Sequence, residues 1–310
     1  LVVVEDNRGK VHRMSKEAIV GAQKLGGDVF ALVIGENASS LCSDLCSLQL
    51  AQILVVEDNL VSTYNADGYA EVVSQIVKLM NIDVIIAGHT YQTRDYMPRV
   101  SAKLDIPFIS DIVGIDQDHY TKQVLNAKLN SSISCSTSSR ILSFQSACFS
   151  EDDIINGTTE VKNIDVNLDS SLVRSTSEEP FQDSASEVDL ESSELIVSVG
   201  RGIEKEENIS IAFDLAKVLN AEVSASRPVV DAGWMPSSRQ VGSSGSTVAP
   251  KLYFSLGVSG AIQHVVGMKG SKTILAINKD RDAPIFEIAD YAVIGDVLEI
   301  IPKLTEVLSE

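Results

Sequence analysis

The stretch PKLYFSLGVSGAIQH, from Pro250 to His264, joins an apolar, strand-like run to a helical pattern. The apolar run covers Leu252 to Val258, is broken at Ser259-Gly260, and gives way to helical spacing near Ala261. The loop between them therefore lies at the carboxyl end of a strand and the amino end of a helix. Open α/β sheets bind nucleotides at such loops, so this stretch predicts a nucleotide site.

Polar residues also gather at the ends of the neighbouring apolar runs. Two further strand-to-helix joints follow, at Asn278-Lys279-Asp280 and at Gly295-Asp296. Upstream lie Ser226-Arg227 and the hydroxyl-rich segment from Gln240 to Gly245. Because the strands themselves are aliphatic while their ends are polar, the pattern predicts a dinucleotide site at one edge of a parallel sheet.

The second half alternates short aliphatic runs with helical patterns, which predicts a doubly wound parallel sheet of about five strands. The expected strands are 195–199, 222–225, 252–258, 273–277 and 291–294, and the expected helices are 209–219 and 297–308.

The first half also begins with strand-helix alternation, which predicts a parallel sheet with right-handed crossovers. The expected strands are 2–4, 29–34, 53–56 and 84–87, with a helix before the last of them. After Pro107 the runs 108–115, 123–129 and 141–149 follow one another without helices, so we expect an antiparallel extension there. This half contains no glycine-rich phosphate loop.

Length and composition limit the class of protein. With 310 residues, of which 44% are hydrophobic, the chain can form two domains with separate cores, which we place at 1–190 and 191–310. No apolar run approaches the roughly 18 residues that cross a bilayer, so we expect no membrane insertion. The net charge of −18 leaves no excess of Lys and Arg to meet phosphates, so we expect no nucleic-acid partner.

Much of the negative charge lies between residues 151 and 194, where Lys162 and Arg174 are the only bases among many acidic and serine residues. We interpret this segment as an exposed, irregular linker in preference to an acidic docking tail. Cysteines stand at positions 42, 46, 135 and 148, with no Cys-His pairing that would complete a metal site. We therefore expect no metal and ordinary reduced thiols in a cytosol-like compartment.

The chain closely resembles the alpha subunit of the electron transfer flavoprotein family. The likeness is strongest in the last hundred residues and weaker in the first half. Residues that carry it are Leu252-Tyr253, Gly257 to His264, Ala276 to Asp280, Ala283 to Phe286, Ala289 to Tyr291, and earlier Leu25 to Asp28, Pro98 to Leu104 and Ile109 to Ile112. The resemblance implies a nucleotide-hydrolase-like first domain without a nucleotide, and a second domain that binds FAD.

Several residues acquire roles through this resemblance. Arg201, between two glycines, matches the arginine that contacts FAD. Arg227 and His264 match residues beside the flavin ring. Ser244 stands where the family has a threonine whose hydroxyl reaches flavin N5, so the hydroxyl is kept and the β-methyl is lost. Asp296 would bond ribose hydroxyls as acidic residues do at other dinucleotide sites.

The full set of expected cofactor-binding residues combines these roles with the strand-end positions. The set is Arg201, Ser226, Arg227, Gln240, Val241, Gly242, Ser243, Ser244, Ser259, Gly260, Ala261, Ile262, Gln263, His264, Asn278, Asp296 and Val297.

The expected function is electron carriage rather than catalysis, because no acid-base pair, nucleophile set or metal cluster can be identified in the sequence. The resemblance implies a heterodimer with a beta subunit that carries AMP. It further implies electron flow from flavin dehydrogenases, notably the acyl-CoA dehydrogenases of fatty acid β-oxidation, to a membrane quinone oxidoreductase. The expected compartment is a bacterial cytoplasm or a mitochondrial matrix.

Three alternatives stay open. The first is a FixB-like or electron-bifurcating form, in which the beta subunit carries a second FAD. The second is an NAD-dependent enzyme such as a deacylase, since the fold expected for the second half also occurs there. The third is a flavin-free scaffold.

Overall fold

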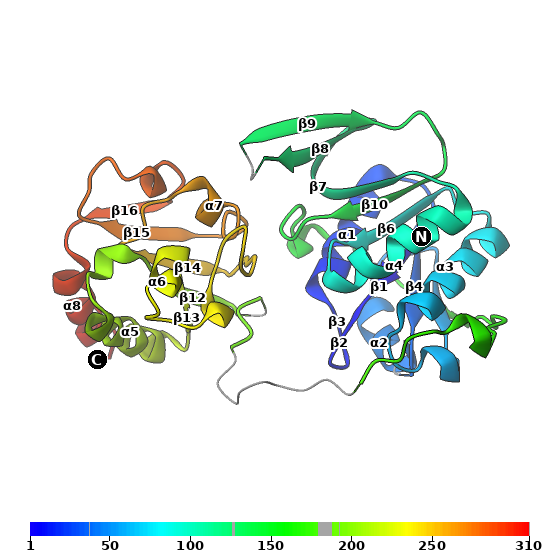
Figure 1. The fold of residues 1–310 in the computed structure, drawn as a ribbon, viewed down its shortest axis with the longest axis horizontal. Helices are drawn as coiled ribbons and strands as arrows, with labels where there is room; N and C mark the ends of the chain where they lie inside the picture. The colour runs from blue at the N-terminus through cyan, green and yellow to red at the C-terminus, as the bar shows by residue number, and fades with distance from the viewer. Residues whose placement is uncertain (37, 126–127, 179–187, 192, 310) are drawn as a thin grey trace. The chain divides into compact units, whose positions relative to one another are not determined.

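The computed structural model describes residues 1–36, 38–125, 128–178, 188–191 and 193–309. These residues form two compact units, each built around a sheet (Figure 1). Both units combine helices with mainly parallel strands, which confirms the expected two-part α/β architecture. The expected division between residues 190 and 191 stays a prediction.

The first unit contains a sheet with the order β11-β5-β4-β1-β6-β10-β7-β8-β9. Every pair from β11 to β7 is parallel, and β8 runs antiparallel to β7. The strands are β1 (Val2–Val4), β4 (Phe30–Ile34), β5 (Gln52–Val56), β6 (Val84–Gly88), β7 (Phe108–Asp116), β8 (His119–Val124), β9 (Leu129–Ser134), β10 (Arg140–Phe144) and β11 (Val161–Asn163), beside a small hairpin of β2 (Asp6–Asn7) and β3 (Lys10–Val11).

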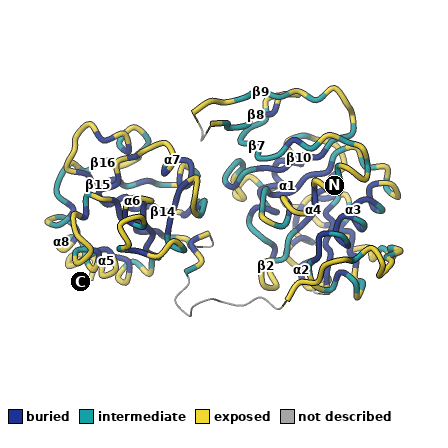
Figure 2. The backbone as a smooth tube through the Cα atoms, in the orientation of Figure 1, coloured by how far each residue is buried: buried dark blue, intermediate teal, exposed yellow. Residues whose placement is uncertain are grey.

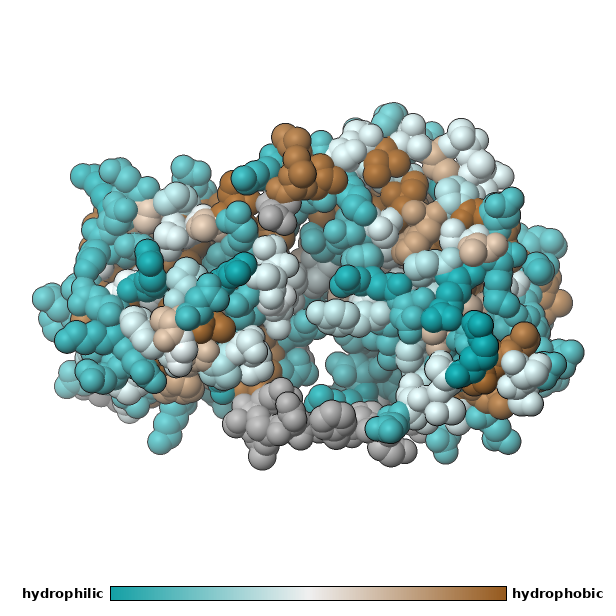
Figure 3. Space-filling model, viewed as in Figure 1, coloured by the Kyte–Doolittle hydropathy of each residue, from teal (hydrophilic) through white to brown (hydrophobic). Residues whose placement is uncertain are grey.

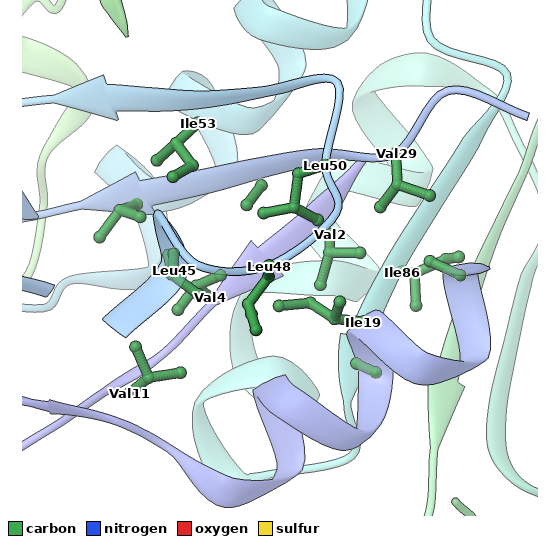
Figure 4. Packing of buried hydrophobic residues seen from close by; sticks show 14 of the residues in the cluster. Val2, Val4, Val11, Ile19, Val29, Leu45, Leu48, Leu50, Ile53 and Ile86 are labelled. Atoms are coloured by element: carbon green, nitrogen blue, oxygen red, sulfur yellow. The ribbon is translucent and has the colours of Figure 1, made fainter. Parts of the chain in front are cut away.

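Helices cover both faces of this sheet. One face packs against α1 (Arg13–Leu25) and α2 (Ala38–Leu45), and the other against α3 (Ala66–Met80) and α4 (Tyr91–Leu104). Successive strand residues point to opposite faces, so Val2 joins the core of Ile19 whereas Val3 joins that of Val73. Figure 4 shows Ile19 among the side chains around Val2, and Figure 2 shows a buried centre in this unit, with β9 exposed or intermediate.

The sequence-based assignment after Pro107 needs correction. The expected antiparallel strand at 141–149 is instead β10, which pairs in parallel with both β6 and β7. The expected strand at 123–129 coincides with the end of β8 and the start of β9, and its residues 126–127 lie outside the described residues. Its apolar character came from Leu125 and Leu129, which are exposed rather than buried in a sheet. The antiparallel extension itself is confirmed by the pairing of β7 with β8.

The acidic segment is only partly the irregular linker that the sequence predicted. Most of its described residues are exposed, as expected, but Val161–Asn163 forms β11 and pairs in parallel with β5. Farther along, Arg174 reaches back to Asp67 with a contact of 3.1 Å. β11 therefore replaces β5 as the edge strand of the sheet, and an edge of only three residues offers little to other chains for pairing. Residues 179–187 and 192 of this segment lie outside the described residues.

The second unit contains a five-stranded, all-parallel sheet with the order β13-β12-β14-β15-β16. The predicted strands and the two predicted helices are confirmed within one or two residues. The elements are β12 (Leu195–Val199), α5 (Ser210–Leu219), β13 (Glu222–Ala225), α6 (Arg227–Asp231), β14 (Leu252–Leu256), α7 (Ile262–Val265), β15 (Ile274–Asn278), β16 (Tyr291–Ile294) and α8 (Val297–Ser309).

The order of these strands reverses between β12 and β14. The chain leaves β12 to form β13 on one side and returns to form β14 on the other. Helices α5 and α8 pack on one face, and the segment around Val241, Val248 and Met268 packs on the other. Ligands of open α/β sheets bind outside the carboxyl ends of the strands at such a reversal. On the outer surface, hydrophilic residues cover most of what Figure 3 displays of each unit.

Glycines let the turns after β12 and β14 meet through their backbones. The Gly202 amide donates to the Gly257 carbonyl over 2.9 Å. A Cβ on Gly257 would lie 2.7 Å from the Gly202 Cα, and a Cβ on Gly200 would collide with the Gly257 carbonyl. Gly257 also has a φ of +62°, which other residues rarely adopt. Side chains at these positions would therefore force the two turns apart.

We expect Gly257→Ala to destabilise the second unit more than Gly233→Ala. Both glycines have positive φ, but a Cβ on Gly233 would meet no atom within 4 Å. Gly233→Ala, the control, should lower the free energy of unfolding by about 1–2 kcal/mol through backbone strain alone. Gly257→Ala should lower it by roughly 1–3 kcal/mol more, because its Cβ overpacks the contact. Urea titrations followed by the fluorescence of Trp234, the single tryptophan, measure this unit. Equal losses in the two variants would contradict the proposed crowding.

A buried carboxylate ties α1 to the turn after β10 in the first unit. Glu17 lies 3.3 Å from the Arg13 guanidinium, and it accepts a 2.7 Å hydrogen bond from the Ala147 amide. Burial raises the pKa of Glu17 to about 7, although Arg13 and Ala147 act to lower it. The folded protein therefore holds a proton on Glu17 more tightly than the unfolded chain does.

This raised pKa predicts a loss of stability as the pH rises. The stabilisation is fully present below the unfolded pKa of 4.5 and is lost as the pH passes through about 7. Between pH 5 and pH 8, wild type should lose about 2 kcal/mol more unfolding free energy than Glu17→Gln, which does not titrate. Urea titrations followed by circular dichroism at the two pH values give this difference, and parallel pH profiles would refute it.

Candidate functional site

A cavity of about 690 Å³ lies at the carboxyl ends of β12, β13, β14 and β15. This volume is in the range of small-molecule and cofactor sites. Each of these strands contributes the residues that immediately follow it, and the loop from Gln240 to Ser244 supplies a further wall. The cavity thus lies where the strand order predicts a ligand.

Most of the residues predicted as cofactor-binding line this cavity. They are Arg201, Ser226, Arg227, Gln240, Val241, Gly242, Ser243, Ser244, Ser259, Ala261, Gln263, His264 and Asn278. Their contact with a cofactor stays a prediction, but the structure brings them together around one space.

Four predicted residues do not line the cavity. Gly260 packs against the backbone of Ile285, and Ile262 is exposed. The Asp296 carboxylate accepts a 2.8 Å hydrogen bond from the Leu298 amide and so caps α8. Val297 is buried in the core with α5. Contact of these four residues with a cofactor stays a prediction.

The cavity also has lining residues that the sequence-based set left out. They are Gly202, Pro228, Asp231, Gly257, Val258, Asp280, Ala283 and Pro284. The sequence could have predicted Asp231 as a lining residue, because it follows Arg227 by four residues and so shares its helix face. Gly202 and Gly257 lie inside the quoted motifs. They contribute no side chain, and their role is to let the two turns approach each other closely.

Two arginines supply positive charge, and they differ in their partners. Within the described part of the chain, the Arg201 side chain makes no hydrogen bond or ion pair, so its guanidinium is free to meet an anion. Arg227 instead lies 3.3 Å from the Asp231 carboxylate, and both side chains are well exposed. The Asp231 charge therefore offsets part of the Arg227 charge beside the cavity.

The hydroxyl-bearing loop is held by backbone contacts. The Ser243 amide donates to the Gln263 carbonyl over 2.7 Å, and a Cβ on Gly242 would lie 2.8 Å from the same carbonyl oxygen. Within the loop, the Gln240 amide donates to the Ser244 hydroxyl oxygen over 2.9 Å. Since an amide N–H donates to this oxygen, the Ser244 proton remains available for a ligand acceptor.

Asn278 joins the turns after β14 and β15. Its amide nitrogen donates to the Val258 carbonyl at 2.9 Å, and its amide oxygen accepts from the Asp280 backbone at 3.0 Å. One donor and one acceptor site of the side chain are thus used to fix backbone. Asn278 also lines the cavity, and its contact with a cofactor stays a prediction.

His264 is buried beside the cavity, with 6% of its surface exposed. Its Nε2 lies 3.0 Å from the Tyr253 hydroxyl. Burial lowers the pKa of His264 to about 4, and the Val241 backbone opposes this only in part. The imidazole is therefore neutral at physiological pH, and one of its two nitrogens is already bound to the protein.

Two kinds of feature are absent from the residues that the structure describes, a cluster of metal-ligating side chains and a membrane-spanning helix. Across those ranges, no group of three or more His, Cys, Asp or Glu side chains is placed to hold a metal ion. The same ranges contain no helix that is both long and apolar enough to cross a bilayer.

Comparisons with known proteins agree over both halves of the chain. Residues 1–169 match the family described as "Electron transfer flavoprotein domain", and residues 189–269 match "Electron transfer flavoprotein FAD-binding domain". The chain is 37% identical to the electron transfer flavoprotein subunit alpha of Thermoanaerobacterium thermosaccharolyticum, covering 98% of this chain and 96% of the relative.

Relatives from other organisms show a similar level of identity. The electron transfer flavoprotein subunit alpha of Bacillus subtilis is 35% identical, over 99% of this chain and 96% of its own length. A probable mitochondrial electron transfer flavoprotein subunit alpha of Caenorhabditis elegans is 36% identical, over 99% of this chain and 93% of its own. The chain therefore belongs to the electron transfer flavoprotein alpha-subunit family, and its second half contains the FAD-binding domain of that family.

Proposed function

We propose that this chain is the FAD-holding alpha subunit of a heterodimeric electron carrier. It takes electrons from flavin dehydrogenases, notably acyl-CoA dehydrogenases, and passes them to a membrane quinone oxidoreductase. Its beta subunit carries AMP. The compartment is a bacterial cytoplasm or a mitochondrial matrix, and relatives described from bacteria and from mitochondria are compatible with either.

The proposal rests on two sets of residues around the cavity, one suited to a pyrophosphate and the other to the edge of a flavin ring. The Arg201 guanidinium, unpaired among the described residues, and the close backbones of Gly200, Gly202 and Gly257 suit a pyrophosphate, which needs positive charge and close approach. Arg227 and Ser244 line the same cavity and suit the polar edge of a flavin ring. The residues present thus fit FAD.

Bound FAD would supply the electron-carrying chemistry, and the chain's own residues would hold it and set its potential. Ser244 keeps its hydroxyl proton for a ligand, because its oxygen accepts from the Gln240 side-chain amide and the proton takes no part in that contact. The contact also ties the Ser244 side chain to the loop, which lacks the threonine β-methyl that restricts a rotamer. Arg227 favours negative charge on the ring, and Asp231 opposes it.

The cavity offers little to an enzyme of the NAD-dependent deacylase class. Its only histidine among the described lining residues is His264, whose pKa is lowered to about 4 and whose Nε2 faces Tyr253. Such an imidazole is a poor general base near neutral pH. The electron-bifurcating form remains the alternative to be tested, since it differs in the content of the beta subunit.

The cofactor content of the assembled protein tests the proposal directly. Co-purification with its beta subunit should give a yellow complex, from which heat releases one FAD and one AMP per heterodimer. Two FAD without AMP would assign the chain to the bifurcating form. A colourless complex with no released flavin would refute the proposed function.

Charge variants at the cavity should move the flavin reduction potential in opposite directions. Arg227→Ala removes a cation that favours the reduced ring, so the potential should fall by several tens of millivolts. For one electron, about 59 mV corresponds to a tenfold change in the equilibrium constant of reduction. Asp231→Asn should raise the potential by a similar amount. Lys251→Ala is the control, because it also removes one cation but lies at the amino end of β14, paired with Glu194.

Spectroelectrochemical titration of each variant with FAD bound measures these shifts. Potentials that move together in Arg227→Ala and Lys251→Ala would show an effect of net charge alone. That result would remove Arg227 from the ring.

A further inference from the structure

An ion pair connects the turns after β12 and β15, which are not neighbours in the sheet. The Lys279 ammonium donates to the Glu204 carboxylate over 2.6 Å, although β14 lies between the two strands. Neither residue is among the described residues that line the cavity, but Arg201 and Gly202 of the first turn and Asn278 of the second are. The pair therefore joins two walls of the cavity without forming part of them.

Two hydrogen bonds already connect these turns to the turn after β14. The Gly202 amide donates to the Gly257 carbonyl over 2.9 Å, and the Asn278 side chain donates to the Val258 carbonyl over 2.9 Å. The ion pair adds a link from the turn after β12 directly to the turn after β15. The three turns thus form a closed set of contacts around the carboxyl end of β14.

Glu204 lies at the centre of a strained turn. Its φ of +71° and ψ of −42°, with a 2.9 Å hydrogen bond from the Lys205 amide to the Ile203 carbonyl, are those of a γ-turn with positive φ. Residues with a Cβ rarely adopt this conformation. Glycine would fit it without strain, so a glutamate here calls for a reason. The contact of its carboxylate with Lys279 supplies one.

The same residue is bonded to the backbone of Arg201. The Glu204 amide donates to the Arg201 carbonyl over 3.0 Å, so the strained turn and the arginine belong to one short unit of backbone. Because the Arg201 guanidinium has no partner among the described residues, no side-chain contact within them fixes its position. Its position therefore depends on the backbone of this turn.

We propose that Glu204 is a positioning residue, which through its contact with Lys279 holds the turn of Arg201 in place for the pyrophosphate of the cofactor. The inference rests on the proposed function, because the position of this turn matters to binding only if an anion meets Arg201. Glu204 itself does not recognise the cofactor, since a carboxylate repels phosphate. Its effect passes through the backbone.

Charge and position make opposite predictions for Glu204. If Glu204 acted only through its charge, Glu204→Gln would tighten FAD binding, and Lys279→Met would weaken it. If it positions the turn, both variants weaken binding, and the double variant is no weaker than either single one. The two side chains are partly exposed, so we expect the dissociation constant to rise only about two- to fivefold.

Titration of FAD into the deflavinated complex of this chain with its beta subunit, followed by flavin fluorescence, measures these dissociation constants. Low ionic strength suits the experiment because salt screens exposed charges. The matched control is the exposed pair of Glu194 and Lys251, 2.9 Å apart at the amino ends of β12 and β14. Glu194→Gln and Lys251→Met should leave the dissociation constant unchanged.

Two further variants separate the side chain of Glu204 from its backbone and test the route through Arg201. Glu204→Gly removes the carboxylate but suits the positive φ, so it should fold at least as well as wild type and still bind FAD as weakly as Glu204→Gln. In a chain that carries Arg201→Ala, adding Glu204→Gln should change the dissociation constant no further.

The outcomes distinguish this inference from the proposed function. Binding by Glu204→Gln or Glu204→Gly that is as tight as in wild type, or tighter, would overturn the positioning role. An undiminished effect of Glu204→Gln beside Arg201→Ala would also overturn it. A wild-type complex that never binds flavin would refute the proposed function and this inference with it, whereas a flavin-loaded wild type with unaffected variants would refute this inference alone.

Discussion

The backbone contact between the turns after β12 and β14 is the constraint on which the candidate site depends. Gly202 and Gly257 are joined by an amide-to-carbonyl bond, and neither position has room for a Cβ. This contact joins the two turns at the point where the strand order reverses. Residues that follow four different strands line one cavity beside it. Arg201, whose guanidinium has no partner among the described residues, directly precedes Gly202, so the contact fixes the backbone beside it.

In both units polar residues lie at the carboxyl ends of parallel strands, but their side chains have different partners. In the first unit, His89 Nδ1 lies 2.8 Å from the Ser143 hydroxyl, and Thr90 donates to the Glu5 carboxylate. Those polar groups at the strand ends bind one another, and a carboxylate stands where a phosphate would need positive charge. In the second unit, Arg201 is left without a partner among the described residues. The two units therefore differ in whether the polar side chains at the strand ends are already paired within the protein, although both units have parallel sheets.

The sequence predicts the strands and most of the cavity wall because both follow from local patterns. Aliphatic runs ending in polar residues identify β12 to β16, and the lining positions fall at those ends. Pairing partners are not local, so the sequence pattern alone places β10 in the antiparallel part and β11 in the linker. Asp296 fits the pattern of a ribose-binding acid, and the fold adds that one of its carboxylate oxygens accepts from the Leu298 amide. Such a second partner of a side chain is visible only once the fold has brought it near.

Tyr253 shows most clearly what a one-dimensional pattern hides. In the sequence it is one more apolar residue of a buried strand, and its ring does pack in the core with Ile196 and Val241. Only the fold brings its hydroxyl to 3.0 Å from Nε2 of His264, a residue of α7. A buried polar group is costly without a hydrogen-bond partner, and this pair supplies one for each side chain. The contact lies beside the cavity that His264 lines, and it depends on long-range packing that no local sequence pattern shows.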